Sequence, residues 1–152
     1  MIFVGILPYS IIQDKYYFLL GQESQGDDAG KWSGFGGRLE AGESIYQGAA
    51  REAYEESMGF LGSEKELLQE INDLNMIADN TFLIYREYDP KLPELYKRVY
   101  QYVQGILLVP PEGYLEKKDV RWFTSEEIIG RPDLLRVAFY KSFQKYLLSS
   151  SL

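Results

Sequence analysis

Two short stretches, Gly37-Arg38-Leu39-Glu40-Ala41-Gly42-Glu43 and Arg51-Glu52-Ala53-Tyr54-Glu55-Glu56, lie seven residues apart and are dense in carboxylates. The second lies in a segment, 44–58, whose pattern predicts a helix entered through Gly42-Glu43-Ser44 and closed by Gly59. At about 100° per residue, Ile45, Ala49 and Ala53 share one narrow apolar face of this helix. That face should pack against a sheet.

The carboxylates of this helix crowd the same side. Glu52 and Glu56 fall within or beside the apolar face, and Glu55 borders it. Like charges at this spacing repel, and the repulsion grows if the groups leave water without a partner. Two interpretations follow: a solvated acidic surface with Arg51 and Lys65 nearby, or a cluster of oxygen ligands for Mg²⁺ or Mn²⁺.

A glycine-rich segment upstream favours the metal interpretation. Trp32-Ser33-Gly34-Phe35-Gly36-Gly37 has three glycines in four positions, so the backbone either turns tightly or approaches a ligand closely. Its carbonyls and amides could complete a coordination shell or contact a phosphate.

Composition excludes several kinds of chemistry. The chain has 152 residues, 45% of them hydrophobic and 26% charged, which predicts one globular domain over residues 1–152. It lacks Cys and His, which excludes disulfides, thiolate nucleophiles, imidazole ligands and His-based catalytic triads. Chemistry must therefore rest on carboxylates, Lys, Arg, Tyr, backbone amides or a hard metal ion. The net charge of −7 argues against binding nucleic acid through its phosphates.

The remaining patterns predict a mixed α/β domain. Strands are expected at residues 2–7, 16–20, 81–88, 99–109 and 119–123. Helices are expected at 44–58, after a capping box formed by Ser63 and Glu66, as a turn at 125–127, and at 132–148. Residues 1–12 lack the basic region of a secretory leader, and no apolar run is long enough to span a bilayer. We therefore expect a cytoplasmic protein without membrane contact.

The spacing of the charged residues resembles the signature of the Nudix hydrolases. That signature runs Gly, five residues, Glu, seven residues, Arg-Glu, an apolar residue, any residue, Glu-Glu, any residue, Gly, and every charged position is matched here. One departure occurs at the end, where Met58 occupies the glycine position and Gly59 comes one residue late. One extra helical residue before the cap would explain this and keep the glutamates in phase.

The resemblance implies an α/β/α sandwich with a mixed sheet over almost the whole chain. It also implies hydrolysis of a nucleoside diphosphate linked to another moiety, with Mg²⁺ or Mn²⁺ as cofactor. Carried over by position, the metal ligands are Glu52, Glu55, Glu56 and the carbonyl of Gly36, with Glu56 or Glu52 also activating water. Arg51 orients the carboxylates and Glu43 supports the site. A further acid before the Trp-bearing strand is best matched by Glu116, ahead of Glu112 and Asp119.

The substrate class is suggested by residues 30–37, which resemble the mammalian MutT-type sanitising enzymes more than the general pattern. This resemblance implies hydrolysis of a nucleoside triphosphate, with oxidised purines among the candidates, to monophosphate and pyrophosphate. Ser33 stands where those relatives have Asn, and Arg131-Pro132-Asp133-Leu134 stands where they have Trp-Pro-Asp-Asp. The predicted substrate contacts are Ser33, Phe35, Gly37 and Asp133.

Several other functions stay open. Other Nudix substrates are dinucleoside polyphosphates, nucleotide sugars and a capped RNA end, the only form in which nucleic acid is expected. A Nudix module that binds a nucleotide without catalysis is a further alternative, although such modules usually lose a catalytic carboxylate. The expected partner is the nucleotide substrate, and the chain is expected to act as a monomer or homodimer.

Overall fold

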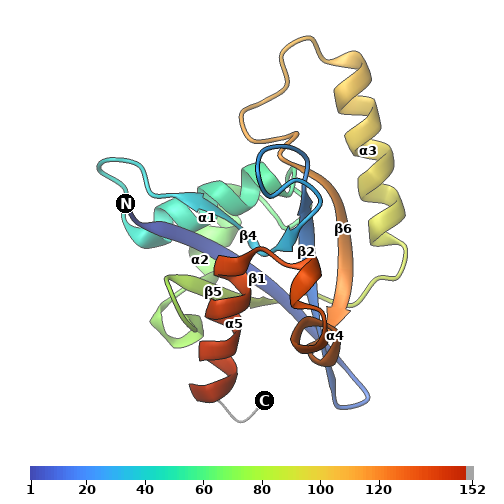
Figure 1. The fold of residues 1–152 in the computed structure, drawn as a ribbon. Helices are drawn as coiled ribbons and strands as arrows, with labels where there is room; N and C mark the ends of the chain where they lie inside the picture. Colours follow the sequence, from blue (N-terminus) through green and yellow to red (C-terminus); the bar gives the residue numbers. More distant parts are fainter. Residues whose placement is uncertain (150–152) are drawn as a thin grey trace.

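A six-stranded sheet with helices on both faces occupies residues 1–149, the part of the chain that the computed structural model describes (Figure 1). The strands are β1 (Phe3–Ile12), β2 (Lys15–Glu23), β3 (Trp32–Ser33), β4 (Phe35–Arg38), β5 (Thr81–Tyr85) and β6 (Lys117–Thr124). The helices are α1 (Ile45–Glu56), α2 (Glu64–Glu70), α3 (Leu92–Ile106), α4 (Ser125–Gly130) and α5 (Val137–Ser149), with 3₁₀ turns η1 (Asp73–Asn75) and η2 (Pro132–Leu134). The predicted α/β/α sandwich is confirmed, while the last three residues of the predicted domain lie outside the described part.

The glycine-rich segment lies in the middle of the sheet because β1 and β2 diverge. These strands pair antiparallel near a two-residue turn, where Gln13 and Asp14 both have positive φ, as such hairpins require. Farther from the turn β1 pairs with β4, and β2 pairs with β3, so the segment 32–38 fills the space between them. The parallel pairing of β1 with β5 makes the sheet mixed, as expected.

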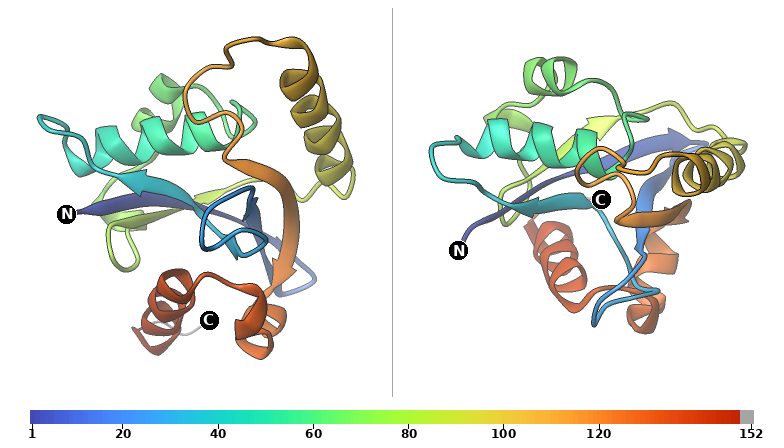
Figure 2. Two further views of the ribbon diagram at one scale, coloured as in Figure 1. Left: turned by 45° about the horizontal axis from the view of Figure 1, so that its top comes forward. Right: turned by 90° about the horizontal axis from the view of Figure 1, so that it is seen from above.

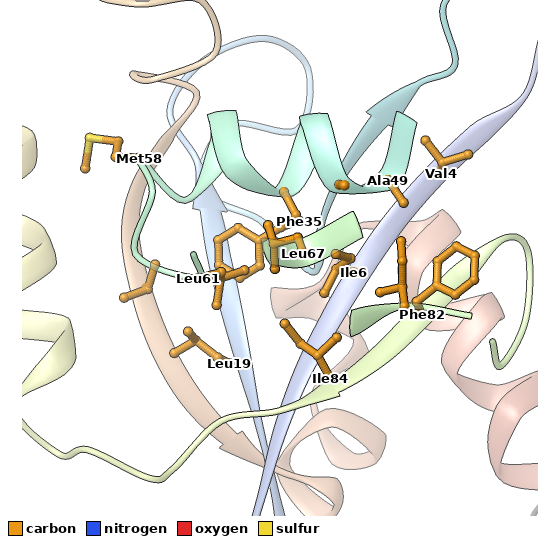
Figure 3. Close-up of a cluster of buried hydrophobic side chains, with 14 of the residues drawn as sticks. Val4, Ile6, Leu19, Phe35, Ala49, Met58, Leu61, Leu67, Phe82 and Ile84 are labelled. Atoms are coloured by element: carbon orange, nitrogen blue, oxygen red, sulfur yellow. The ribbon is translucent and has the colours of Figure 1, made fainter. Parts of the chain in front are cut away.

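Helix α1 packs on one face of the sheet through small side chains. A capping box between Ser44 and Gln47 starts the helix. Ala49, Ala50 and Ala53 are fully buried, so the helix axis lies close to β1 and β4 (Figure 3). The predicted apolar face of this helix is confirmed.

Helices α4 and α5 cover the opposite face, and Figure 2 shows the sheet between them and α1. The core on this side is aromatic, with the ring of Phe143 on α5 packed edge-on against that of Phe18 on β2, 5.2 Å between centroids. None of the helices described in residues 1–149 has the length and apolar character needed to cross a membrane.

The strand expected at 99–109 is wrong. Residues 92–106 form helix α3, which packs against β6, and residues 107–109 lie exposed beyond it. Val99, Tyr100, Tyr102 and Val103 favour strands by propensity, but the side chains buried at 96 and 103 have helical spacing. Pro93 lies in the first turn of the helix, where its missing N–H breaks no hydrogen bond.

Other boundaries differ by a few residues. The capping box of Ser63 and Glu66 is confirmed, but α2 ends at Glu70 and the exposed Leu74 lies in η1. The strand expected at 81–88 ends at Tyr85. The closing helix starts at 137 rather than 132, because Leu135 forms a bridge with Trp32 at the edge of the sheet.

The departure at the end of the glutamate motif has a different cause from the one expected. Helix α1 gains no extra residue: it ends at Glu56 with Ser57 as its cap, and Met58 itself adopts the left-handed conformation, φ 51°. Gly59 follows with φ 78°, and its amide donates to the carbonyl of Tyr54. Met58 is only 8% exposed and belongs to the core cluster under α1 (Figure 3).

Replacing Met58 by glycine tests which effect dominates at this position. Glycine removes about 1–2 kcal/mol of left-handed strain, whereas truncating a buried methionine costs about 2–5 kcal/mol. We therefore expect Met58→Gly to lower the free energy of unfolding by about 1–3 kcal/mol, measured by urea denaturation. Met58→Leu, which keeps an apolar side chain, should cost less. A more stable Met58→Gly protein would show that strain dominates.

Candidate active site

Three carboxylates from two distant parts of the chain meet beside β4. Oxygen atoms of Glu52, Glu56 and Glu116 all lie within 4.8 Å of one another. The first two lie one turn apart on α1, and Glu116 immediately precedes β6. We call Glu52, Glu56 and Glu116 the carboxylate trio.

Glu56 is the buried member of the trio. It is 4% exposed, and one carboxylate oxygen, Oε1, accepts a hydrogen bond of 2.8 Å from the amide of Gly36. The interpretation of a solvated acidic surface is therefore wrong for this residue. Burial raises the pKa of Glu56 well above its ordinary value, and the neighbouring Glu116 raises it further. Burial also raises the pKa of Glu52.

The bare backbone of Gly37 leaves room for Glu52, which lies directly against it. A Cβ atom on Gly37 would lie 2.5 Å from the carboxyl carbon of Glu52. The predicted proximity of the glycine segment to the carboxylates is thus present, through the amide of Gly36 and the bare backbone of Gly37.

Arg51 holds the carboxylates from the outer side. Its guanidinium donates to both oxygens of Glu43, at 2.7 and 3.0 Å, in a bidentate pair. Its Nη1 also lies 3.1 Å from Glu52 and 3.4 Å from Glu55. The hydrogen bond from Arg51 lowers the pKa of Glu43, which stays ionised and fixes the guanidinium.

Glu55 lies apart from the trio, under the loop that leads to β6. A Cβ on Gly113, whose φ is +81°, would lie 2.7 Å from the Cβ of Glu55, so this loop presses closely on α1. Burial raises the pKa of Glu55 to about 7, and the charges of Glu52 and Glu112 contribute. The nearby Arg51 opposes this shift.

Lys117 is a second cation at the site that the sequence patterns did not indicate. It is 1% exposed, and its Nζ donates to Glu23 at 2.8 Å and to the hydroxyl of Ser33 at 2.9 Å. Its positive charge opposes the rise in the pKa of Glu56. The pairing of β2 with β6 shifts register between Gln22 and Glu23, where Lys117 pairs with Glu23. No periodic pattern in the sequence indicates that the Lys117 side chain is buried.

Two further residues make room for Lys117 and fix it. The aliphatic stem of Lys117 passes over Gly21, where a Cβ would lie 2.8 Å from Cδ. A glycine inside a strand was the available signal for this close approach. The fully buried Tyr96 hydroxyl of α3 contacts the carbonyls of Lys117, at 2.8 Å, and Glu56, at 3.1 Å. Helix α3 therefore connects the ends of α1 and β6.

The trio fits a divalent cation. Every donor is a carboxylate oxygen, which suits a hard ion such as Mg²⁺ or Mn²⁺, and two donors are already restrained by neighbouring groups. Gly36 presents its amide to Glu56, so a contact between its carbonyl and an ion stays a prediction, as does ligation by Glu55.

Comparison with known proteins agrees with this geometry. A NUDIX domain model matches residues 4–146, nearly the whole chain. The chain belongs to the Nudix hydrolase family. The expectation from the spacing of the glutamates is thus confirmed.

Relatives with a described activity match only a short stretch of this Nudix chain. It is 56% identical over 39 residues to the oxidized purine nucleoside triphosphate hydrolase of Danio rerio, and 54% identical over 39 residues to that of Mus musculus. Each match spans 26% of this chain and 25% of the relative.

Solved structures share the fold at low sequence identity. The NUDIX domain of Shewanella oneidensis NrtR complexed with ADP ribose has a TM-score of 0.57 and 13% identity, covering 98% of this chain and 87% of that one. A C. elegans Ap4A hydrolase binary complex has a TM-score of 0.51 and 18% identity, covering 97% and 98%. These likenesses support the Nudix fold and nothing finer.

A cavity of about 450 Å³ lies between α5 and the face of β4 opposite α1. Its sheet side includes the bare backbones of Gly5, Gly34 and Gly36, and its helix side includes Phe139. Because Gly36 also contacts Glu56, the cavity and the carboxylate trio share one strand.

The predicted substrate contacts differ in their relation to this cavity. Ser33 and Gly37 line it, although the Ser33 hydroxyl already accepts from Lys117 and donates to the carbonyl of Gly34. The ring of Phe35 is buried in the core under α1, so only its backbone can face a ligand. Asp133 is exposed and paired with Arg131 at 3.0 Å. Their roles in substrate binding stay predictions.

Gly37→Ala should weaken metal binding without unfolding the protein. The added Cβ meets the flexible end of Glu52 rather than backbone, so the side chain must move while the strand stays. We expect Mn²⁺ affinity, measured by calorimetry, to fall about 10-fold or more. The control is Gly105→Ala in α3, where nothing lies within 4 Å of the new Cβ. Unchanged Mn²⁺ affinity in Gly37→Ala would contradict the placement of Glu52 as a ligand.

The metal-free protein should be less stable at about pH 8 than at about pH 6. The pKa values of Glu52, Glu55 and Glu56 are raised, that of Glu55 to about 7, so the folded state holds protons that the unfolded state has released. Stability therefore falls as pH rises from the ordinary carboxylate pKa through 7. Saturating Mn²⁺ should raise the melting temperature by several degrees more at the higher pH, measured by differential scanning calorimetry. An equal rise in melting temperature with Mn²⁺ at both pH values would contradict this prediction.

Proposed function

We propose that this Nudix hydrolase is a Mg²⁺- or Mn²⁺-dependent pyrophosphohydrolase that cleaves a nucleoside triphosphate to nucleoside monophosphate and pyrophosphate. The observation that carries the proposal is the carboxylate trio held beside the two glycines of β4. The substrate class is supported by the 39-residue likeness to oxidized purine nucleoside triphosphate hydrolases, which keeps oxidised purines among the candidate bases.

The residues of the site would have different roles in the reaction. Glu52, Glu56 and Glu116 would hold the cation, with Glu55 and the Gly36 carbonyl as further ligands. A bound Mg²⁺ would neutralise the pyrophosphate oxygens and lower the pKa of a water, so no histidine is needed. Glu56 or Glu52 would accept the proton of the attacking water. The water would attack either the α- or the β-phosphorus. The bond from that phosphorus to the oxygen that bridges the two would break, giving nucleoside monophosphate and pyrophosphate.

The supporting residues would keep this arrangement rigid before substrate arrives. Arg51, fixed by Glu43, would orient Glu52 and Glu55 through the ion pairs described above. Across the sheet, Ser33, Gly37 and the Phe35 backbone would border the nucleoside, and the exposed Asp133 would supply a further contact. Preorganised groups of this kind reduce the reorganisation required in the transition state.

Product analysis tests the proposal. The protein with Mg²⁺ would be incubated with ordinary and oxidised nucleoside triphosphates, dinucleoside polyphosphates, nucleotide sugars and a capped RNA. We expect monophosphate and pyrophosphate from a triphosphate, with kcat reduced at least about 10²-fold in Glu56→Gln. Glu94→Gln, the same change at an exposed glutamate of α3 paired with Arg98, should keep full activity.

Two results would contradict the proposal. Hydrolysis of another substrate class alone would replace the triphosphate assignment. Nucleotide binding without turnover of any member of the panel would favour a non-catalytic module.

A further inference from the structure

The cavity beside β4 contains one clamped arginine, Arg136. Its amide donates to the carbonyl of Trp32 at 3.0 Å, which fixes the start of α5 against the sheet. Its Nε lies 3.0 Å from Asp28 and its Nη1 3.2 Å from Glu23. Within residues 1–149, Nη2 makes no hydrogen bond, and Arg136 lines the cavity. The guanidinium is therefore held in place, and both N–H bonds of Nη2 and one of Nη1 remain available as donors.

The positive charge of this arginine is offset by nearby carboxylates, while Lys141, which also lines the cavity, forms no ion pair within residues 1–149. Glu23 and Asp28 offset Arg136 and the buried Lys117. At the other end of the cavity Asp79 pairs with Lys145 at 3.2 Å and accepts from Ser142. Because Glu23 and Asp28 offset the charge of Arg136 itself, its remaining N–H groups suit a neutral group that carries hydrogen-bond acceptors.

The apolar lining suits a flat ring. Phe3 and Phe139 face the cavity, and Gly5, Gly34 and Gly36 leave its floor without side chains. Aromatic side chains stack on nucleobases irrespective of base identity. The rings can therefore hold a base, while Arg136 is left to distinguish one base from another.

We infer that Arg136 reads the O6 and N7 edge of a guanine-type base and gives this enzyme a preference for guanine and hypoxanthine nucleotides. Guanine presents two adjacent acceptors on this edge, which an arginine or lysine can bind together, whereas adenine presents an amino donor in place of O6. A guanine oxidised at C8 carries hydrogen on N7 and loses one acceptor. This inference rests on the proposed function, because it requires the phosphates to lie at the carboxylate trio across β4.

Equilibrium binding of non-hydrolysable nucleotides tests the inference without turnover. The probes are α,β-methylene analogues of GTP, ITP, ATP and 7-deaza-GTP, titrated with Mg²⁺ by calorimetry. We expect the GTP and ITP analogues to bind about 10-fold more tightly than the ATP analogue. The 7-deaza analogue, which lacks the N7 acceptor, should bind several-fold more weakly than the GTP analogue.

Arg136→Met keeps most of the aliphatic length and removes every donor. It should bind the GTP and ATP analogues with equal affinity. The control is Arg98→Met, the same substitution at an exposed arginine of α3 that pairs with Glu94 at 2.8 Å, and it should keep the preference. The 7-deaza comparison uses the unaltered protein, so it tests the contact even if Arg136→Met does not fold.

Three results would overturn the inference: an ATP analogue bound as tightly as the GTP analogue, a folded Arg136→Met protein that keeps the preference, or no binding of any purine analogue. A guanine preference in binding without hydrolysis of GTP would overturn the proposed function and leave the reading of the base intact.

Discussion

Burial of the Glu56 carboxylate beside β4 is the constraint on which the site depends. A buried carboxylate is costly unless it is hydrogen-bonded and compensated. Here the compensation comes from the Gly36 amide at 2.8 Å and from the nearby positive charge of Lys117. The alanine face of α1 allows the helix to approach the sheet, and the bare backbone of Gly37 leaves room for Glu52. Small side chains on both surfaces therefore bring the carboxylates together.

Two cations lie near the carboxylates of the site, Arg51 beside Glu52 and Glu55, and Lys117 near Glu56. Arg51 lies on the outer side and is fixed by Glu43, while Lys117 lies inside the fold and is fixed by Glu23 and Ser33. The two cations lie on different elements: Arg51 is on α1 with Glu52, Glu55 and Glu56, whereas Lys117 is the first residue of β6. The site is thus supported by elements that are far apart in the chain.

The strand β4 separates two chemical environments. On one side lie the carboxylates that suit a metal ion, and on the other lies a glycine-floored cavity bordered by α5. Gly36 and Gly37 give this strand two successive positions without side chains, beside both environments. Gly37 leaves room for Glu52 and also lines the cavity, so the same stretch of backbone borders both environments.

Local patterns were sufficient for the glutamate helix, its apolar face, the capping box at Ser63 and the first hairpin, because each depends on neighbours within a few residues. Spacing along α1 also placed Glu52 and Glu56 together, and Glu116, which the resemblance gave as the best candidate for a further acid, lies beside them. Helix α3 was mistaken for a strand, because β propensity at 99–103 competed with a helical period that packing on β6 favours. The left-handed Met58, the inward turn of Lys117 and the clamp on Arg136 depend on the assembled sheet. The residues that they contact lie far away in sequence. These contacts form only when distant strands pair, so a pattern of neighbouring residues cannot predict them.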